Sequence, residues 1–400
     1  MARRGVASAV GERAAQAVEG ASSQGPGDHL LISLAAVFLR LGLTSFGGPA
    51  AHVALMRDEF VRRRGWLDDA AFIDLLGAAN LIPGPTSTEL AMHIGHRRAG
   101  RVGLVVAGLA FLLPAVAIVA VLAWLYVEQG QRPEVGALLL GIGPVVVAIV
   151  AHAGWSIART VVRTPLAAVL LLATIGAAVA GIPEIAVLLA AGLVAVAIHL
   201  RGRSGAVAGG LIPTGAMLAT GSTLGVAAPA IFVSFLKIGA VLFGSGYVLV
   251  ALLRSELVDG LGWLSERQLL DAVAVGQATP GPLFSTATFI GYVLAGPLGA
   301  VAATVGVFLP AFLAVGLSIP VLDRLRRSAD ARAFLDGVNV GAVALIAIVA
   351  VQLGIGAIRD PLSLASAAVA FVLLVAGVGT GRLILAGAVI GLMRLAWMPS

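Results

Sequence analysis

The sequence has 400 residues, of which 59% are hydrophobic and only 12% are charged. A soluble domain carries roughly 25% charged residues, so this composition excludes an ordinary soluble enzyme or binding domain. The net charge of +6 does not indicate nucleic-acid binding, because the arginines concentrate in short loops, where they orient a membrane protein. The absence of cysteine excludes disulfides and thiolate metal sites.

Residues 1–28 are polar, and no apolar core follows their first arginines, so we expect a flexible head and no cleaved signal peptide. Beyond them, apolar runs of about 20 residues recur, the length that a helix needs to cross a bilayer. Residues 205–226 are rich in Gly and Thr and predict a linker. It would join a first repeat at 29–204 to a second repeat at 227–400.

The two halves are copies of one sequence. A shift of 197 residues carries Arg40 to Lys237, Glu59 to Glu256 and the Pro-Gly-Pro at 83–85 to the one at 280–282. One residue is lost after Ser285, so later positions recur at a shift of 196. A register held over so many positions indicates a duplication.

The charges predict that the second copy is inverted in the membrane. The loops around the first Pro-Gly-Pro are basic and those around the second are not, and basic loops lie in the cytoplasm. Each half is expected to have five crossings together with one hairpin. Because five is an odd number, the second half would enter the membrane from the opposite side. The expected fold is therefore an all-α polytopic integral membrane protein of two inverted-topology repeats, with about ten spanning helices and two re-entrant Pro-Gly-Pro hairpins.

Arg40 and Lys237 occupy equivalent positions inside apolar spans. A cation near a helix centre costs about 2.5–3.5 kcal/mol on insertion scales. Each could snorkel to the interface or pair with a buried acid such as Glu89. Their recurrence in both copies favours a second interpretation, in which they face a central cavity where an anion passes.

The two Pro-Gly-Pro segments predict breaks in helices at membrane depth. Proline forces the residue before it out of the helix and suits the start of a new one. The amides at the new helix start would then be unpaired and would bind an oxyanion; a simple kink is the alternative. The substrate-binding candidates of the two breaks are Pro83, Gly84, Pro85, Thr86, Ser87, Thr88, Pro280, Gly281, Pro282 and Ser285.

Two further sets of small or amide residues flank the breaks. One consists of glycines, which could expose backbone amides to a ligand or could only let helices pack closely. The other consists of amides that could contact substrate or satisfy freed backbone groups. These candidates are Gly47, Gly48, Gly244, Gly246, Asn80 and Gln277.

Charged residues suggest coupling and gating. Glu89 and His93 lie four residues apart after the first break only, so Glu89 is a candidate proton carrier, or else neutralises Arg40. Two ion pairs, Arg57 with Glu59 and Arg254 with Glu256, are candidate gates; alternatively they stabilise an interfacial helix. His93 and His96 lack a third ligand, and no phosphate-binding Walker motif occurs, so we expect no metal, no cofactor and no ATP hydrolysis.

With these residues in view, the chain resembles the chromate ion transporter family from about residue 30 to its C-terminus. The matching segments are residues 38–49, 57–67, 83–91 and 111–114, and in the second copy 235–239, 243–246, 263–264 and 280–282. The resemblance implies a secondary transporter, not an enzyme, that exports chromate across a bacterial inner membrane and confers resistance. The resemblance also implies that the functional residues include Arg40, residues 83–85 and residues 86–89.

Without the resemblance, the residues support only a carrier of a tetrahedral oxyanion. Sulfate or another oxyanion as cargo, a passive anion channel, and an intramembrane enzyme on a lipid phosphate are the alternatives. The last needs paired acids or a metal cluster, for which buried acids are too few. The expected partners are chromate or a sulfate-like oxyanion and the lipid bilayer, and a homodimer is compatible with the sequence. The second copy has Leu283 and Phe284 where the first has Thr86 and Ser87, so the halves are not expected to contact substrate equally.

Overall fold

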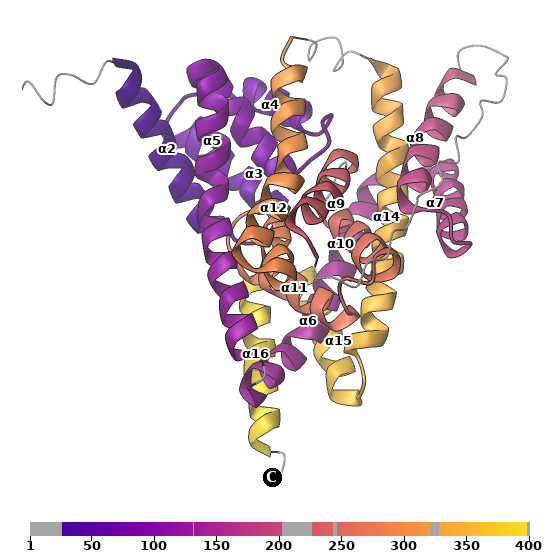
Figure 1. The fold of residues 1–400 in the computed structure, drawn as a ribbon. Helices are drawn as coiled ribbons and strands as arrows, with labels where there is room; N and C mark the ends of the chain where they lie inside the picture. The colour runs from indigo at the N-terminus through magenta and orange to yellow at the C-terminus, as the bar shows by residue number, and fades with distance from the viewer. Residues whose placement is uncertain (1–25, 131, 202–225, 243–245, 321–327, 398–400) are drawn as a thin grey trace, which may run out of the picture.

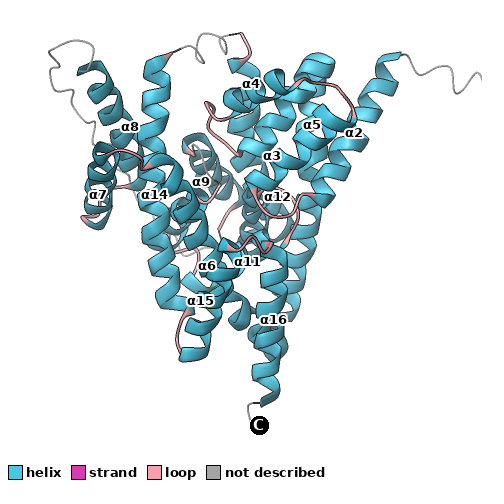
Figure 2. Cartoon of the chain, turned by 180° about the vertical axis from the view of Figure 1, so that it is seen from behind, coloured by secondary structure: helices cyan, strands magenta, loops and turns pink. Residues whose placement is uncertain are grey.

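The computed structural model describes residues 26–130, 132–201, 226–242, 246–320 and 328–397, and their regular structure is helical without strands (Figures 1 and 2). Residues 1–25 of the expected head, most of the linker and the candidate Gly244 lie outside the described residues, and the last three residues of the expected head begin helix α2. The expectation of an all-α protein is confirmed.

The helices of the two repeats follow one another in the same order. The first repeat contains α2 (Pro26–Thr44), α3 (Pro49–Arg57), the π-helix η1 (Asp58–Arg63), α4 (Asp69–Ala79), α5 (Thr86–Gln129), α6 (Pro133–Val161), α7 (Pro165–Val179) and α8 (Glu184–Arg201). The second contains α9 (Ala228–Val241), α10 (Val248–Leu253), the π-helix η2 (Arg254–Gly260), α11 (Glu266–Ala278), the 3₁₀ turn η3 (Leu283–Ser285), α12 (Thr286–Ser318), α14 (Ala329–Ala357), α15 (Pro361–Val375) and α16 (Thr380–Trp397).

Local sequence explains where several of these helices begin. Asp68 accepts a hydrogen bond from the amide of Ala71 at 2.7 Å and caps α4. At the equivalent place Ser265 and Gln268 form a capping box at the start of α11. Each cap satisfies an amide that would otherwise lack a partner in the first turn. The two half-length helices therefore start at defined, equivalent positions.

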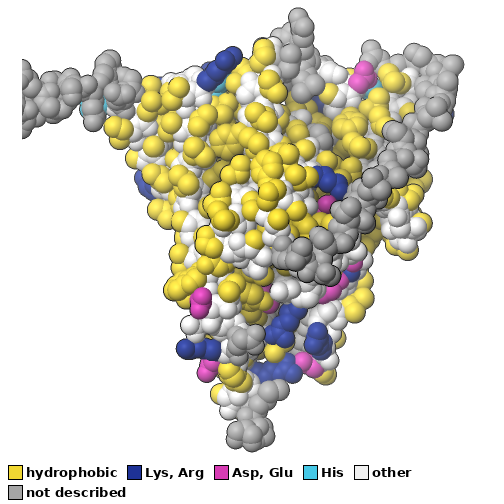
Figure 3. Space-filling model, in the orientation of Figure 1, with side chains coloured by type: hydrophobic (Ala, Val, Ile, Leu, Met, Phe, Trp, Pro, Cys, Tyr) yellow, Lys and Arg dark blue, Asp and Glu magenta, His cyan; other side chains and the backbone are white. Residues whose placement is uncertain are grey.

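Six of the described helices are long and apolar enough to cross a membrane: α5, α6, α8, α14, α16 and the segment Leu283–Ser318 that contains α12. Four shorter apolar helices, α2, α7, α9 and α15, occupy the remaining places where spans were expected. Hydrophobic side chains cover most of the upper and middle surface in Figure 3, whereas charged side chains gather at the lower end. This is the surface of a polytopic membrane protein, as expected from the composition.

A sharp turn divides α5 and α12 into a short and a long arm each. The backbone φ and ψ angles are non-helical at Ala99 and Gly100 in α5, and at Ala295 and Gly296 in α12. The short arm folds back on the long one so closely that a Cβ on Gly95 would lie 2.3 Å from the carbonyl oxygen of Gly103. Only glycine permits this approach, which holds the two arms as a helical hairpin.

The long arms of α5 and α12 lie side by side and run in opposite directions (Figure 1). Gly108 faces Phe312, and Leu104, four residues earlier, packs in one cluster with Val315, three residues later. Because α5 and α12 are equivalent helices, their antiparallel contact places the turns of the two hairpins at opposite ends of this pair.

Candidate functional site

The two Pro-Gly-Pro segments form non-helical breaks, each between a half-length helix and a hairpin arm. Gly84 has φ of 144° and Gly281 has φ of 96°. These angles are rare for residues with a side chain, which is why a glycine occupies the centre of each break.

Each break packs against the long arm of the other repeat. A Cβ on Gly84 would lie 2.7 Å from the Cβ of Ala311 in α12, and a Cβ on Gly281 would lie 2.6 Å from the Cβ of Ala115 in α5. Ala115 and Ala311 are themselves equivalent positions. The contact is thus reciprocal and joins both breaks to the α5–α12 crossing.

The end of α2 also meets the second break. The amide of Gly281 donates a hydrogen bond of 2.8 Å to the carbonyl of Ser45, just beyond α2. The same carbonyl lies 3.1 Å from Nε2 of the buried His52, which is placed to donate to it. The first repeat therefore supplies the backbone acceptor that fixes the second break.

The helix starts offer fewer free amides than expected. The amide of Thr88 donates to the carbonyl of Pro85 at 2.8 Å, and the amide of Ser285 donates to that of Pro282 at 2.9 Å. The expectation that the Thr88 amide is unpaired is therefore wrong, because Pro85 and Pro282 act as the first acceptors of the new turns.

Several polar side-chain atoms around the breaks are buried without hydrogen-bond partners in the described part of the chain. A buried polar atom left unpaired costs roughly 1–3 kcal/mol, so such atoms are few in folded proteins. Here they cluster in sequence at the two helix starts and at the residues that meet them. They are Ser45 Oγ, Thr88 Oγ1, both carboxylate oxygens of Glu89, His93 Nε2, Gln277 Nε2, Ser285 Oγ and Thr286 Oγ1.

Glycines and an aromatic hydroxyl complete the surroundings of the second break. Gly47 and Gly48 have positive φ, and a Cβ on Gly48 would lie 3.4 Å from the hydroxyl of Tyr247. Tyr247 forms a hydrogen bond with the side chain of Gln277, and Gly246 precedes it. Asn80 is different: it is exposed at the end of α4. Sequence reasoning missed Tyr247, although its place directly after a repeated glycine cluster was a usable signal.

The two repeated cations each bind a carboxylate. Arg40 lies 2.5 Å from Glu59, and Lys237 lies 2.6 Å from the equivalent Glu256. Glu59 also accepts from Arg64 at 2.6 Å. Burial alone would raise the pKa of Glu59, but the two guanidinium groups outweigh it and hold that pKa below its ordinary value. The acid that pairs with Arg40 is therefore Glu59, and Glu89 is not its partner.

The two expected gating pairs form with other partners. Arg57 binds Asp69 at 2.7 Å and not Glu59, and Arg254 binds Asp259 at 2.5 Å and also Glu266, not Glu256. The expected pairing was wrong because residues two apart on a helix point to different sides, and Glu59 and Glu256 instead bind Arg40 of α2 and Lys237 of α9. Arg57–Asp69 connects the end of α3 to the start of α4, and Arg254–Glu266 connects η2 to the start of α11.

Within the described ranges, His, Asp and Glu side chains form no group of three that could hold a metal ion. The polar groups at the two helix breaks are hydroxyl, amide, carboxyl and imidazole groups.

Several known proteins are similar in sequence to this chain over most of its length. The family profile described as "Chromate transporter" matches residues 32–196 and again residues 229–392. The chain is 36% identical to the chromate transport protein of Pseudomonas aeruginosa over 341 residues, which cover 80% of each chain. It is 34% identical to the chromate transport protein of Cupriavidus metallidurans, over 80% of this chain and 81% of that one.

A probable chromate transport protein of Synechococcus elongatus is 32% identical over 83% of this chain and 86% of its own length. No solved structure gives a significant match. The duplicated match and these identities lead to one conclusion: the chain belongs to the chromate transporter family.

Proposed function

We propose that this protein is a secondary active transporter that exports chromate across the bacterial inner membrane, by alternating access and with proton coupling. Membership of the family, and the names of its relatives, support chromate as cargo. The observation that carries the transport mechanism is the reciprocal packing of each break against the long arm of the other repeat.

That packing supports alternating access for a geometric reason. Two equivalent breaks pack against one crossing, each on the long arm of the other repeat, so tilting one repeat against the other would open one break as it closes the other. Across the two repeats, Gly84 and Gly281 face only the short side chains of Ala311 and Ala115, which permits such sliding. In this proposal the cargo passes between the two breaks.

The unpaired buried groups are the proposed contacts of the oxyanion and of the proton. Hydroxyl and amide donors such as Thr88, Ser285 and Gln277 can donate to a tetrahedral anion without a full positive charge. Glu89 is completely buried with both oxygens unpaired, so it is the proposed proton carrier. His93 lies one turn further along the same arm and is the proposed relay.

The paired cations have a proposed role at the cavity mouths. Arg40 is half exposed while its partner Glu59 is almost completely buried, with 52% and 6% of the side chain accessible. An arriving oxyanion can therefore approach Arg40 while Glu59 keeps the guanidinium in place. The equivalent Lys237 and Glu256 would act in the same way in the second repeat.

The test uses purified protein in liposomes loaded to give an outward or inward proton gradient. We expect saturable chromate flux that responds to the gradient, and Glu89→Gln should abolish that response while the protein still inserts. Flux that does not saturate and follows voltage alone would establish a channel instead. Competition by sulfate at equal concentration would make sulfate or a related oxyanion the cargo.

A matched pair of arginine variants tests the proposed cation. Arg40→Ala should abolish transport, whereas Arg63→Ala, which removes an exposed arginine paired with Asp58, should leave it unchanged. Transport near the wild-type rate in Arg40→Ala would reject the proposed role of Arg40.

A further inference from the structure

A pocket separate from the two breaks lies between α6, α11 and α14. Its walls are mostly apolar, with Leu140 and Gly143 from α6 and Leu353 from α14. Its polar groups are Glu266, Arg267 and Asp271 of α11 and Arg359, which follows α14. Two arginines thus line one small, mostly apolar space.

The acidic groups of the pocket already have partners. Glu266 is bound by Arg254, and Asp271 accepts a hydrogen bond of 2.9 Å from the hydroxyl of Tyr126. Neither carboxylate forms a hydrogen bond or ion pair with Arg267 or Arg359 among the described residues, although the charge of Arg267 acts on Asp271, one turn further along α11.

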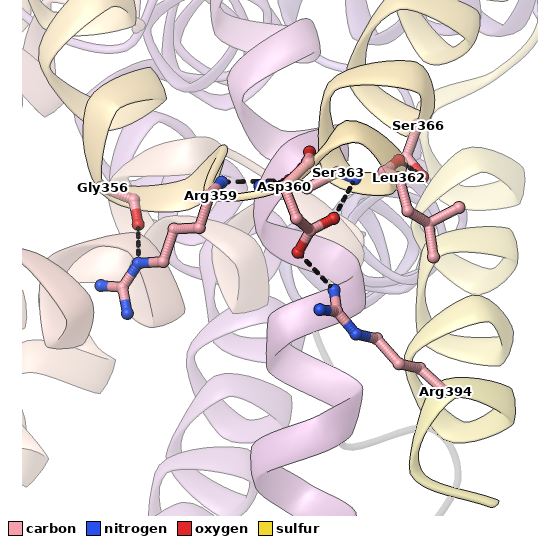
Figure 4. Close-up of polar contacts among 7 residues, drawn as sticks. All are labelled: Gly356, Arg359, Asp360, Leu362, Ser363, Ser366 and Arg394. Carbon is pink, nitrogen blue, oxygen red and sulfur yellow. Dashed lines mark hydrogen bonds and ion pairs between the residues drawn. The ribbon is translucent and has the colours of Figure 1, made fainter. Parts of the chain in front are cut away.

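The guanidinium groups of the two arginines make other contacts. Figure 4 shows that Asp360, the neighbour of Arg359, is taken by Arg394 at 2.7 Å, while the guanidinium of Arg359 turns away and donates to the carbonyl of Gly356 at 2.9 Å. The Arg267 guanidinium lies beside Gly136 at the start of α6. In the part of the chain that the structure describes, neither guanidinium forms an ion pair.

The pocket is connected to the second break by one face of α11. Arg267, Asp271, Ala274 and Gln277 recur at intervals of three or four residues, so they lie along a single side of that helix. Arg267 and Gln277 are separated by about 15 Å at the helical rise of about 1.5 Å per residue. The same helix therefore carries both Gln277 of the second break and Arg267 of the pocket.

The pocket lies at the far end of the molecule from the basic turn of the first hairpin. Tyr126, which binds Asp271, lies about 39 Å along α5 from the turn at Gly100, a full membrane thickness. If the basic turn faces the cytoplasm, as its charges indicate, the pocket faces the opposite side.

The first repeat has no counterpart of this arginine pair. Arg359 corresponds to Arg163, but the position of Arg267 is occupied by Ala70, and the equivalent of the buried Asp271 is the exposed Asp74. The two ends of an otherwise duplicated protein therefore differ in charge.

We propose that this pocket is a second oxyanion site, in which Arg267 and Arg359 hold the anion after it leaves the second break and before it reaches water. The inference rests on the proposed function and adds to it a site on the release side. Paired guanidinium groups suit a tetrahedral dianion because each donates two hydrogen bonds in fixed geometry.

The experiment compares the wild type, the double variant Arg267→Ala/Arg359→Ala, and Arg163→Ala as a matched control from the first repeat. Chromate transport is measured in liposomes with chromate offered on the side of the pocket, and chromate binding is measured by equilibrium dialysis of the detergent-purified chain. Size-exclusion profiles establish that each variant is folded.

We expect the double variant to raise the KM and the Kd for chromate about tenfold, the factor that corresponds to about 1.4 kcal/mol, with kcat nearly unchanged. Arg163→Ala should leave both constants at wild-type values. Wild-type binding in the double variant would overturn the inference, as would an equal loss in Arg163→Ala, which would indicate only a general surface potential. A wild-type chain that binds chromate but transports none would refute the proposed function, while the dialysis would still decide on the pocket.

Discussion

Adding one methyl group at the centre of a break tests whether the two repeats meet as tightly as described. Gly84→Ala places a Cβ at 2.5 Å from Oε1 of Glu89 and 2.7 Å from the Cβ of Ala311, at a φ of 144°. Gly281→Ala places one at 2.6 Å from the Cβ of Ala115, at a φ of 96°. Both variants combine an unfavourable backbone angle with steric overlap.

The expected loss of stability follows from these two contributions. A left-handed backbone costs an ordinary residue roughly 1–2 kcal/mol. Overpacking of a close contact adds typically about 1–3 kcal/mol. We therefore expect each variant to lose about 2–5 kcal/mol of unfolding free energy.

Two other glycines separate the contributions. Gly181 has φ of 85° with open space around its α-carbon, so Gly181→Ala should show the backbone cost alone. Gly176 lies in α7 with no close neighbour and no positive φ, so Gly176→Ala should be neutral or slightly stabilising. The free energies are measured by denaturant titration in mixed micelles, and chromate flux is measured in parallel.

The result is decided by the order of the unfolding free energies of the four variants. If Gly84→Ala and Gly281→Ala lose no more stability than Gly181→Ala, the breaks do not pack against the opposite long arms. The proposed alternating movement about this crossing would then have no structural basis.

Three further perturbations have defined outcomes. Gly95→Val should abolish folded yield in a fluorescence size-exclusion assay, since its Cβ would overlap the carbonyl of Gly103 at 2.3 Å; normal yield would contradict the hairpin. Glu59→Gln should remove a carboxylate that binds two arginines and lower thermal stability; an unchanged melting temperature would refute that role. The Ser363 amide and Arg394 lower the pKa of Asp360, so its stabilisation is present above its ordinary pKa of 3.8 and is lost as pH falls through the depressed value. Acid unfolding should therefore be less steep in Asp360→Asn, and identical profiles would contradict the linkage.

Helices, breaks and duplication were predictable because they depend on local properties. Apolar runs of spanning length, prolines that exclude the helix, and cap residues such as Asp68 and Ser265 act within a few positions of the chain. The repeat itself is visible in the sequence without any structure. For this reason the all-α membrane fold and the positions of both Pro-Gly-Pro breaks could be stated in advance.

The partners of the charged and polar groups could not be predicted, because they depend on segments far apart in sequence. Arg57 binds Asp69 and Arg40 binds Glu59 across 12 and 19 residues of the chain, and Tyr126 reaches Asp271 only because α5 passes beside α11. Likewise, the sequence by itself determined that glycine stands at both breaks, whereas the tertiary structure decided that each glycine faces the other repeat. The physical reason is that close packing selects among many sterically allowed pairings, and that selection is made by the whole fold at once.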